Sequence, residues 1–174
     1  MKAIQCEKYG GPEVLKAVEL EIPKPKPNEI LIKTYTSTVS AADYRVRSFS
    51  VPTEMRFPAR LMLGFKGPKR SVLGAELAGT IQAIGSEVDR YKVGDEILAA
   101  ALPYFGGYAE YTCLPESGAI ALKPKGLTWK EAAAIPIGAI TAYQYLQKAK
   151  VSPGKKVLIY GASGSVGTYA IQIA

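Results

Sequence analysis

A glycine-rich segment near the C-terminal end limits what this chain can fold into more than any other feature. Four apolar residues at 157–160 (VLIY) precede glycines spaced three residues apart, and an apolar run follows them. A short uninterrupted apolar run is typical of a strand buried on both faces of a parallel sheet. Glycines after such a strand let the backbone turn sharply and let the next helix pack closely. The segment predicts the first strand, turn and helix of a Rossmann α/β domain.

The same segment predicts a dinucleotide site. At such a turn a diphosphate can approach the backbone N–H groups and the positive end of the helix dipole. The spacing is GxxGxxG whereas the commoner fingerprint is GxGxxG, and glycine-rich strand-to-helix turns also occur without ligands. The expected cofactor-binding residues of the turn are Gly161, Ala162, Ser163, Gly164, Ser165, Val166 and Gly167.

The residues before about 125 are predicted to be mostly β. Apolar and polar residues alternate at 1–9, 13–23 and 28–39, as they do in half-buried strands. Further strands are expected within 71–85, 86–100 and 106–124, and the glycines of the first of these favour bulges or close backbone approach. Residues 41–48 form a short helical candidate. This pattern predicts a compact barrel or sandwich with one helix and one large loop.

After Pro124 the apolar spacing becomes helical. Thr128 and Glu131 have the spacing of a capping box, and Pro136 is expected to separate two helices. We therefore predict a first domain over 1–125, and connecting helices with the beginning of a Rossmann domain over 126–174. One strand and part of a helix cannot close such a domain, so we expect the chain to be the N-terminal fragment of a longer protein.

Composition excludes several kinds of catalytic site. The chain has no histidine and only two cysteines, Cys6 and Cys113. This rules out histidine-based triads and dyads and makes a conventional zinc site improbable, so we expect no metal. Both cysteines are expected to be buried thiols. Without a signal peptide or a membrane-length apolar stretch, a cytoplasmic protein without a membrane partner is expected.

The positive charge is concentrated in one segment. Residues 45–70 hold seven Lys and Arg against Glu54, a net charge of +6 out of +7 for the whole chain. Such a segment is usually a solvated loop, and its Gly and Pro residues favour mobility. We expect no nucleic-acid partner. The alternative is a non-catalytic binding module whose segment 45–70 contacts RNA or an acidic partner.

Seven short motifs occur in an order that resembles one protein family. They are MKAI..EKYGGPEVLK, STVSAADYRVR, LGAELAGTIQAIGSEV, YKVGDEI, GGYAEYT, AAAIPIGAITAY and GASGSVG. Together the chain resembles the N-terminal portion of the medium-chain dehydrogenase/reductase superfamily, in its zinc-independent quinone oxidoreductase-like branch, which is often called alcohol dehydrogenase-like. The resemblance implies a mostly β GroES-like catalytic domain followed by a Rossmann cofactor domain.

The resemblance also implies an activity. The parent protein is expected to be an NADPH-dependent oxidoreductase, with NAD as a possible cofactor, and a homodimer. Its small-molecule substrate is expected to be a quinone, a conjugated enone or an aldehyde such as an enal. Zinc members of the superfamily hold their metal with residues that match Ser40, Ala75 and a position near Ile137 here. Since none of these three can replace the Cys or His ligands, the resemblance favours hydride transfer without zinc.

Four positions acquire expected roles from the resemblance. Zinc-free relatives commonly have Asn-Pro-x-Asp where this chain has Ser40 to Asp43. In place of the Asn amide, the Ser40 hydroxyl could donate a shorter hydrogen bond to the nicotinamide or the substrate. Asp43 is read as a local anchor to Arg47, four residues later on the same helical face. Tyr44 is a candidate proton donor, or else a packed or surface aromatic. Thr141 is either a neighbour of the nicotinamide or a helix residue bonded to a carbonyl.

Overall fold

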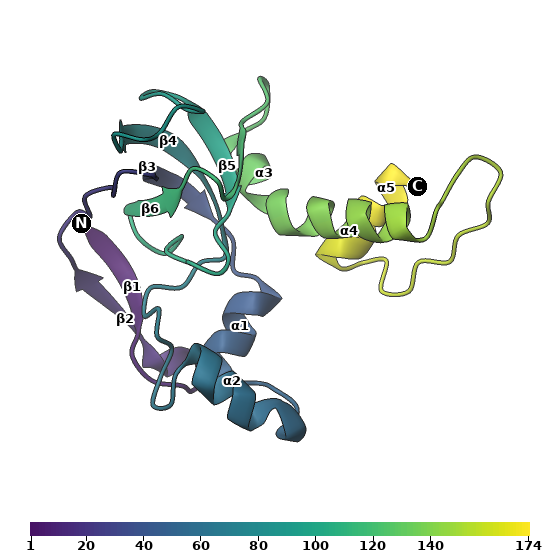
Figure 1. The fold of residues 1–174 in the computed structure, drawn as a ribbon. Helices are drawn as coiled ribbons and strands as arrows, with labels where there is room; N and C mark the ends of the chain where they lie inside the picture. The colour runs from purple at the N-terminus through teal and green to yellow at the C-terminus, as the bar shows by residue number, and fades with distance from the viewer.

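A computed structural model describes residues 1–174, and all of its strands lie within the first 122 residues, where they form two antiparallel sheets (Figure 1). The smaller sheet pairs β1 (Lys2–Cys6) with β2 (Leu15–Glu19), joined through a 3-10 turn at Pro12–Val14. The larger sheet has the order β6-β3-β4-β5-β7. Its strands are β3 (Glu29–Ser37), β4 (Glu76–Ile84), β5 (Glu96–Ala100), β6 (Tyr111–Pro115) and β7 (Ala119–Leu122). The predicted strands and the mostly β character are confirmed.

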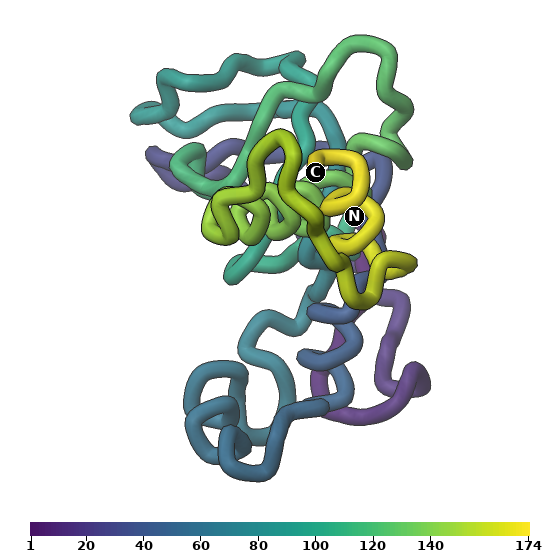
Figure 2. The backbone as a smooth tube through the Cα atoms, turned by 90° about the vertical axis from the view of Figure 1, so that its right-hand side faces the viewer, coloured from purple at the N-terminus to yellow at the C-terminus, as the bar shows by residue number.

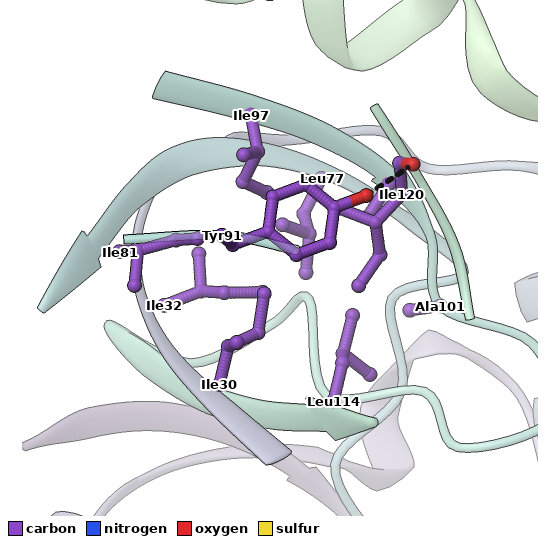
Figure 3. Packing of buried hydrophobic residues seen from close by; sticks show 10 residues of the cluster. Ile30, Ile32, Leu77, Ile81, Tyr91, Ile97, Ala101, Leu114 and Ile120 are labelled. Atoms are coloured by element: carbon purple, nitrogen blue, oxygen red, sulfur yellow. Dashed lines mark hydrogen bonds between the residues drawn. The ribbon is translucent and has the colours of Figure 1, made fainter. Parts of the chain in front are cut away.

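The alternating pattern of these strands supplies the main core. Ten buried residues meet inside the larger sheet (Figure 3). They are Ile30, Ile32, Leu77, Ile81, Tyr91, Ile97, Ala99, Ala101, Leu114 and Ile120. Full burial of one large apolar side chain stabilises a fold by about 1.5–3 kcal/mol. The Tyr91 hydroxyl donates a 2.7 Å hydrogen bond to the Ile120 carbonyl, so the one polar tip in this core is satisfied.

Strands β3 and β4 approach closely at a glycine. A Cβ on Gly79 would collide with the Lys33 carbonyl on the facing strand. The register between the two strands also shifts twice, between Leu31 and Ile32 and between Thr34 and Thr36. The expected bulges and close backbone approach are therefore confirmed in this region.

The predicted helix at 41–48 is confirmed as α1 (Ala41–Ser48), but the prediction of one large loop after it is wrong. A 3-10 turn at Thr53–Met55 leads into α2 (Arg56–Leu63). The Arg60 guanidinium lies 4.9 Å from the Tyr9 ring centroid and 4.2 Å from that of Phe49, and so attaches the helix to the body. Arg60 of the basic segment thus contacts aromatic rings and takes part in no ion pair with an acidic side chain.

Three helices complete the chain, and they are α3 (Trp129–Ala134), α4 (Pro136–Lys148) and α5 (Ser165–Ile173). The capping box of Thr128 and Glu131 is confirmed, and Pro136 opens α4 as expected. Figures 1 and 2 show α4 and α5 side by side, projecting from the larger sheet. None of the helices combines the length and apolar character that crossing a bilayer requires. The predicted domain division at 125 stays a prediction.

The predicted strand at 157–160 is wrong. Residues 155–159 have no regular structure, and Leu158 is 94% exposed. Strands exist through hydrogen bonds to neighbouring strands, and no strand of this chain lies beside the segment. Its apolar side chains therefore have nothing to pack against.

Both cysteines are free thiols, as expected, but they differ in burial. Cys6 is fully buried, whereas Cys113 on β6 is half-buried, so the prediction of two buried thiols holds for only one of them. Burial raises the pKa of each thiol, and that of Cys113 reaches about 11. Neither thiol is activated as a nucleophile.

Candidate functional site

The glycine-rich turn has a conformation that depends on glycine at two positions. Gly161 has φ +75°, which favours glycine, and its carbonyl accepts a 3.0 Å hydrogen bond from the Gly164 N–H. Gly167 is buried in the first turn of α5, where a Cβ would collide with the backbone of Gly161 and Ala162. Gly161 therefore permits the turn, and Gly167 permits the helix to pack on it.

Gly164 differs from these two because it faces open space. It is the N-cap of α5, and a Cβ on it would touch only the Gly161 carbonyl, at 3.4 Å. No side chain caps the helix, and Ser163, Gly164 and Ser165 are exposed. The unpaired N–H groups of a helix N-terminus attract anions, and here nothing obstructs a phosphate from reaching them. The predicted residues 161–167 thus lie together at the start of α5, and their role in binding a dinucleotide phosphate stays a prediction.

Helix α4 holds α5 in place through close packing at Gly138. A Cβ on Gly138 would collide with the Ser165 hydroxyl and lie against the Tyr169 ring, and the Tyr169 hydroxyl donates to the Ala134 carbonyl at 3.3 Å. Thr141 lies one helical turn after Gly138 and is half-buried. The Thr141 hydroxyl donates no hydrogen bond to a backbone carbonyl, so the alternative of a helix residue bonded to a carbonyl is wrong. Its place beside a nicotinamide stays a prediction.

Ser40 and Asp43 form a capping box at the start of α1. The Asp43 Oδ2 atom accepts bonds from the Ser40 N–H at 2.9 Å and from the Ser40 hydroxyl at 2.7 Å. The Asp43 N–H in turn donates to Ser40 Oγ at 3.4 Å. The Ser40 hydroxyl hydrogen is thus already donated to Asp43, so Ser40 has no free hydrogen for the bond that the sequence predicts it to donate to a ligand. Since its oxygen also accepts the Asp43 N–H, one lone pair remains that can accept a hydrogen bond from a ligand.

The predicted partner of Asp43 is wrong, although its role as an anchor is right. Its carboxylate is 3% exposed, and Oδ1 accepts a 2.9 Å bond from the Gly74 N–H. Arg47 instead donates to the Gly10 carbonyl at 2.6 Å. A carboxylate in the first turn reaches back to the free N–H groups of the helix start, so it faces away from residues one turn later.

Tyr44 lies on the surface of α1. Its side chain is 53% exposed, and the Arg47 guanidinium lies 5.6 Å from its ring centroid. Tyr44 is therefore a surface aromatic, which agrees with that alternative, and whether its hydroxyl donates a proton stays a prediction. The structure places Tyr44 and Ser40 on the same helix, four residues apart.

Sequence reasoning missed Glu76, a buried acid in β4. Its Oε2 accepts a 2.7 Å bond from the Thr38 hydroxyl, and its Oε1 accepts a 2.7 Å bond from the Ile137 N–H in the first turn of α4. Glu76 thereby joins the larger sheet to the helix that carries Thr141. The signal for this role was a carboxylate inside an otherwise apolar strand, because buried charges are rarely without partners.

Tyr108 is a second residue that sequence reasoning missed. Its hydroxyl is buried and has no hydrogen-bond partner of good geometry. Burial raises the pKa of Tyr108 well above its ordinary range, and the nearby Asp43 carboxylate adds to the rise. Because eleven tyrosines occur in the chain, nothing in the sequence distinguishes this one.

The positions that match zinc ligands in the superfamily hold Ser40, Ala75 and Ile137, of which only Ser40 carries a side-chain oxygen. No group of three or more His, Cys, Asp and Glu side chains lies close enough together to hold a metal ion. A conventional zinc donor set is therefore not built by these residues.

A cavity of the β-rich domain lies away from these residues. It has a volume of about 630 Å³ and separates the smaller sheet from β3 and the segment 107–110. None of the predicted site residues lines it. A site formed by the exposed turn before α5, the adjoining face of α4 and the start of α1 stays a prediction.

Comparisons with known proteins identify the family of the chain. The alcohol dehydrogenase GroES-like domain family matches residues 26–125. The chain is 36% identical over 182 residues to a 2-methylene-furan-3-one reductase of Solanum lycopersicum, covering 100% of this chain and 44% of the relative. It is 35% identical over 176 residues to a quinone oxidoreductase of Homo sapiens, and this match covers 100% of this chain and 49% of the relative. The chain thus spans about half the length of the curated relatives it matches.

Solved structures show the same likeness in three dimensions. The quinone oxidoreductase from Coxiella burnetii superposes with a TM-score of 0.85 at 34% identity, covering 99% of this chain and 52% of that one. The Escherichia coli quinone oxidoreductase complexed with NADPH superposes with a TM-score of 0.82 at 29% identity, and the match covers 99% of this chain and 49% of that one. The predicted GroES-like domain is confirmed, and the chain belongs to the alcohol dehydrogenase GroES-like domain family of the medium-chain dehydrogenase/reductase superfamily.

Proposed function

We propose that the whole protein containing this chain is an NAD(P)H-dependent oxidoreductase that transfers a hydride to a quinone or to the conjugated carbon of an enone or enal without zinc. The observation that carries the proposal is the turn at 161–167, where Gly164 faces open space before an uncapped helix N-terminus. Relatives named quinone oxidoreductase and furanone reductase support this activity class.

The chain's own residues would bind and orient the cofactor. The N–H groups at the start of α5 and the exposed Gly164 would hold the diphosphate, and Ser163 and Ser165 can add hydroxyl contacts. The half-buried Thr141 on α4 would contact the nicotinamide end, with α4 held in position by Glu76. When bound, the reduced nicotinamide supplies the hydride, so the protein's contribution is largely positioning.

A proton must follow the hydride to complete the reduction. The hydride adds to the conjugated carbon, and the resulting enolate takes a proton on carbon or oxygen. Tyr44 is the proposed donor within this chain because its hydroxyl is exposed beside α1, and solvent is the other source. Ser40 would accept a hydrogen bond from the ligand, since its own hydrogen is donated to Asp43.

Preference for NADPH over NADH, a homodimeric parent and independence from zinc belong to the same proposal. The Escherichia coli relative with NADPH supports the first of these. The alternative, a module that binds RNA or an acidic partner, gains no support because the relatives are named for oxidoreductase activity.

The test is turnover by the whole protein. NADPH absorbance is followed with an enone and, separately, with a benzoquinone, and NADH replaces NADPH in a parallel series. Oxidation that depends on the acceptor is expected, and its absence with every pair would overturn the proposal. Tyr44→Phe then tests the proton donor: a lower turnover number with unchanged cofactor affinity is expected, and an unchanged turnover number assigns the proton to solvent.

A further inference from the structure

A second pocket lies between α1, α2 and the segment 102–105. Its volume is about 460 Å³, which is within the range of about 300–1,000 Å³ usual for small-molecule sites. We call it the α1–α2 pocket. It is lined by Ala42, Arg45, Val46, Met62, Leu63, Pro68, Lys69, Arg70, Leu102, Pro103 and Phe105. None of the residues proposed for hydride transfer lines it.

The floor of the α1–α2 pocket is apolar and continuous with a core. Phe105 is buried in a cluster with Cys6 and Leu73, and Ala42 and Val46 pack against that cluster from α1. These residues are fixed by the fold, so the floor exists before any ligand arrives. Binding of an alkyl or aryl group there is favoured because its apolar surface is removed from water.

The polar lining of the pocket has only one sign of charge. Arg45, Lys69 and Arg70 are its only charged residues, and each is exposed. None of the three takes part in an ion pair. Lys69 is held at the pocket because its Nζ donates a 2.7 Å bond to the Leu61 carbonyl of α2.

These two features together select a ligand class. A small, strongly hydrated anion would lose its water on an apolar floor, which disfavours its binding. An organic cation would be repelled by the three cations, which have no acidic partners. A molecule with an apolar body and one carboxylate satisfies both parts, because arginine binds carboxylates through paired hydrogen bonds. We propose that the α1–α2 pocket binds an amphipathic organic anion, a medium-chain alkyl or aryl carboxylate, with its tail on Phe105 and its carboxylate on Arg45 and Arg70.

Calorimetric titration of the 174-residue chain tests the ligand class, with dodecanoate as the probe. One saturable site is expected, and dodecanol should bind about tenfold more weakly because it lacks the charge. Equal affinity for the alcohol would overturn the role of the cations. Absence of saturable binding, or many molecules bound per chain, would overturn the site itself.

Two pairs of variants test the location. Arg45→Ala combined with Arg70→Ala should weaken dodecanoate binding at least tenfold, whereas Arg56→Ala, a basic residue of α2 outside the pocket, should not. Met62→Asp should also weaken it, with Met55→Asp as the matched control, since both side chains are exposed and only Met62 lines the pocket. Equal losses in variant and control would show general charge attraction and overturn the pocket assignment. Turnover of the whole protein is a separate measurement, so failure here leaves the proposed function standing.

Discussion

The Asp43 carboxylate accepts a 2.9 Å hydrogen bond from the Gly74 N–H, which joins the start of α1 to the residue two before β4. Gly74 has φ +96°, a conformation that favours glycine, and its N–H is buried. With two further bonds from Ser40, the buried carboxylate has a donor at each oxygen. This explains how a charge can be fully buried beside an apolar cluster.

Asp43→Asn should destabilise the fold by about 1–3 kcal/mol. An amide has only one acceptor oxygen, so its NH₂ group would face either the Ser40 or the Gly74 donors. Urea unfolding followed by circular dichroism measures the loss. Asp89→Asn is the matched control because Asp89 is exposed and its carboxylate accepts no hydrogen bond. Equal midpoints for the two variants would contradict a structural role for Asp43.

Gly164→Val should raise the NADPH dissociation constant of the whole protein at least tenfold, which requires only about 1.4 kcal/mol. The new side chain would occupy the space into which a diphosphate must come. Folding should survive, because a Cβ there meets only the Gly161 carbonyl at 3.4 Å. Gly167→Val is the contrasting variant, since its Cβ would strike backbone and should destabilise the fold. Unchanged affinity in folded Gly164→Val would remove the phosphate role of the turn.

Stability should fall as pH rises from about 9 toward about 11, the pKa that burial gives the Cys113 thiol. The folded state keeps the proton over this range while the unfolded state releases it, so ionisation favours unfolding. Cys113→Ala should remove about 1–2 kcal/mol of this decline. Unfolding free energies of both proteins at several pH values provide the measurement. Parallel pH profiles would show that Cys113 does not titrate with a raised pKa.

Amide hydrogens across 50–70 should exchange faster than those of β4. Helix α2 has only eight residues, and Phe57, Leu61 and Met62 are all more than 60% exposed, so little burial opposes local opening. Hydrogen exchange read by mass spectrometry compares the two segments in one sample. Protection in α2 equal to that of β4 would mean that the basic segment is as rigid as the sheet.

Zinc content should be far below one ion per chain. The chain has no histidine, and the positions that match the zinc ligands of other superfamily members hold Ser40, Ala75 and Ile137. Elemental analysis after dialysis, without a chelator so that bound metal is retained, decides the matter. One tightly bound zinc would contradict the assignment.

The sequence alone determined the features that depend on neighbours a few residues apart. It predicted α1 at both ends, the capping box of Thr128 and Glu131, and the division of two helices at Pro136. The glycine spacing likewise predicted the turn into α5. Caps and turns are made by bonds within one helical turn, so their partners are visible in the chain order.

Only the tertiary structure decided which distant groups meet. Asp43 bonds a residue 31 positions away, and Glu76 bonds Ile137 61 positions away, partners that no local pattern specifies. The apolar run at 157–160 also shows that a local pattern does not determine tertiary contacts. Its composition is that of a buried strand, yet it forms none, because a strand is made by its neighbours and none lies beside it here.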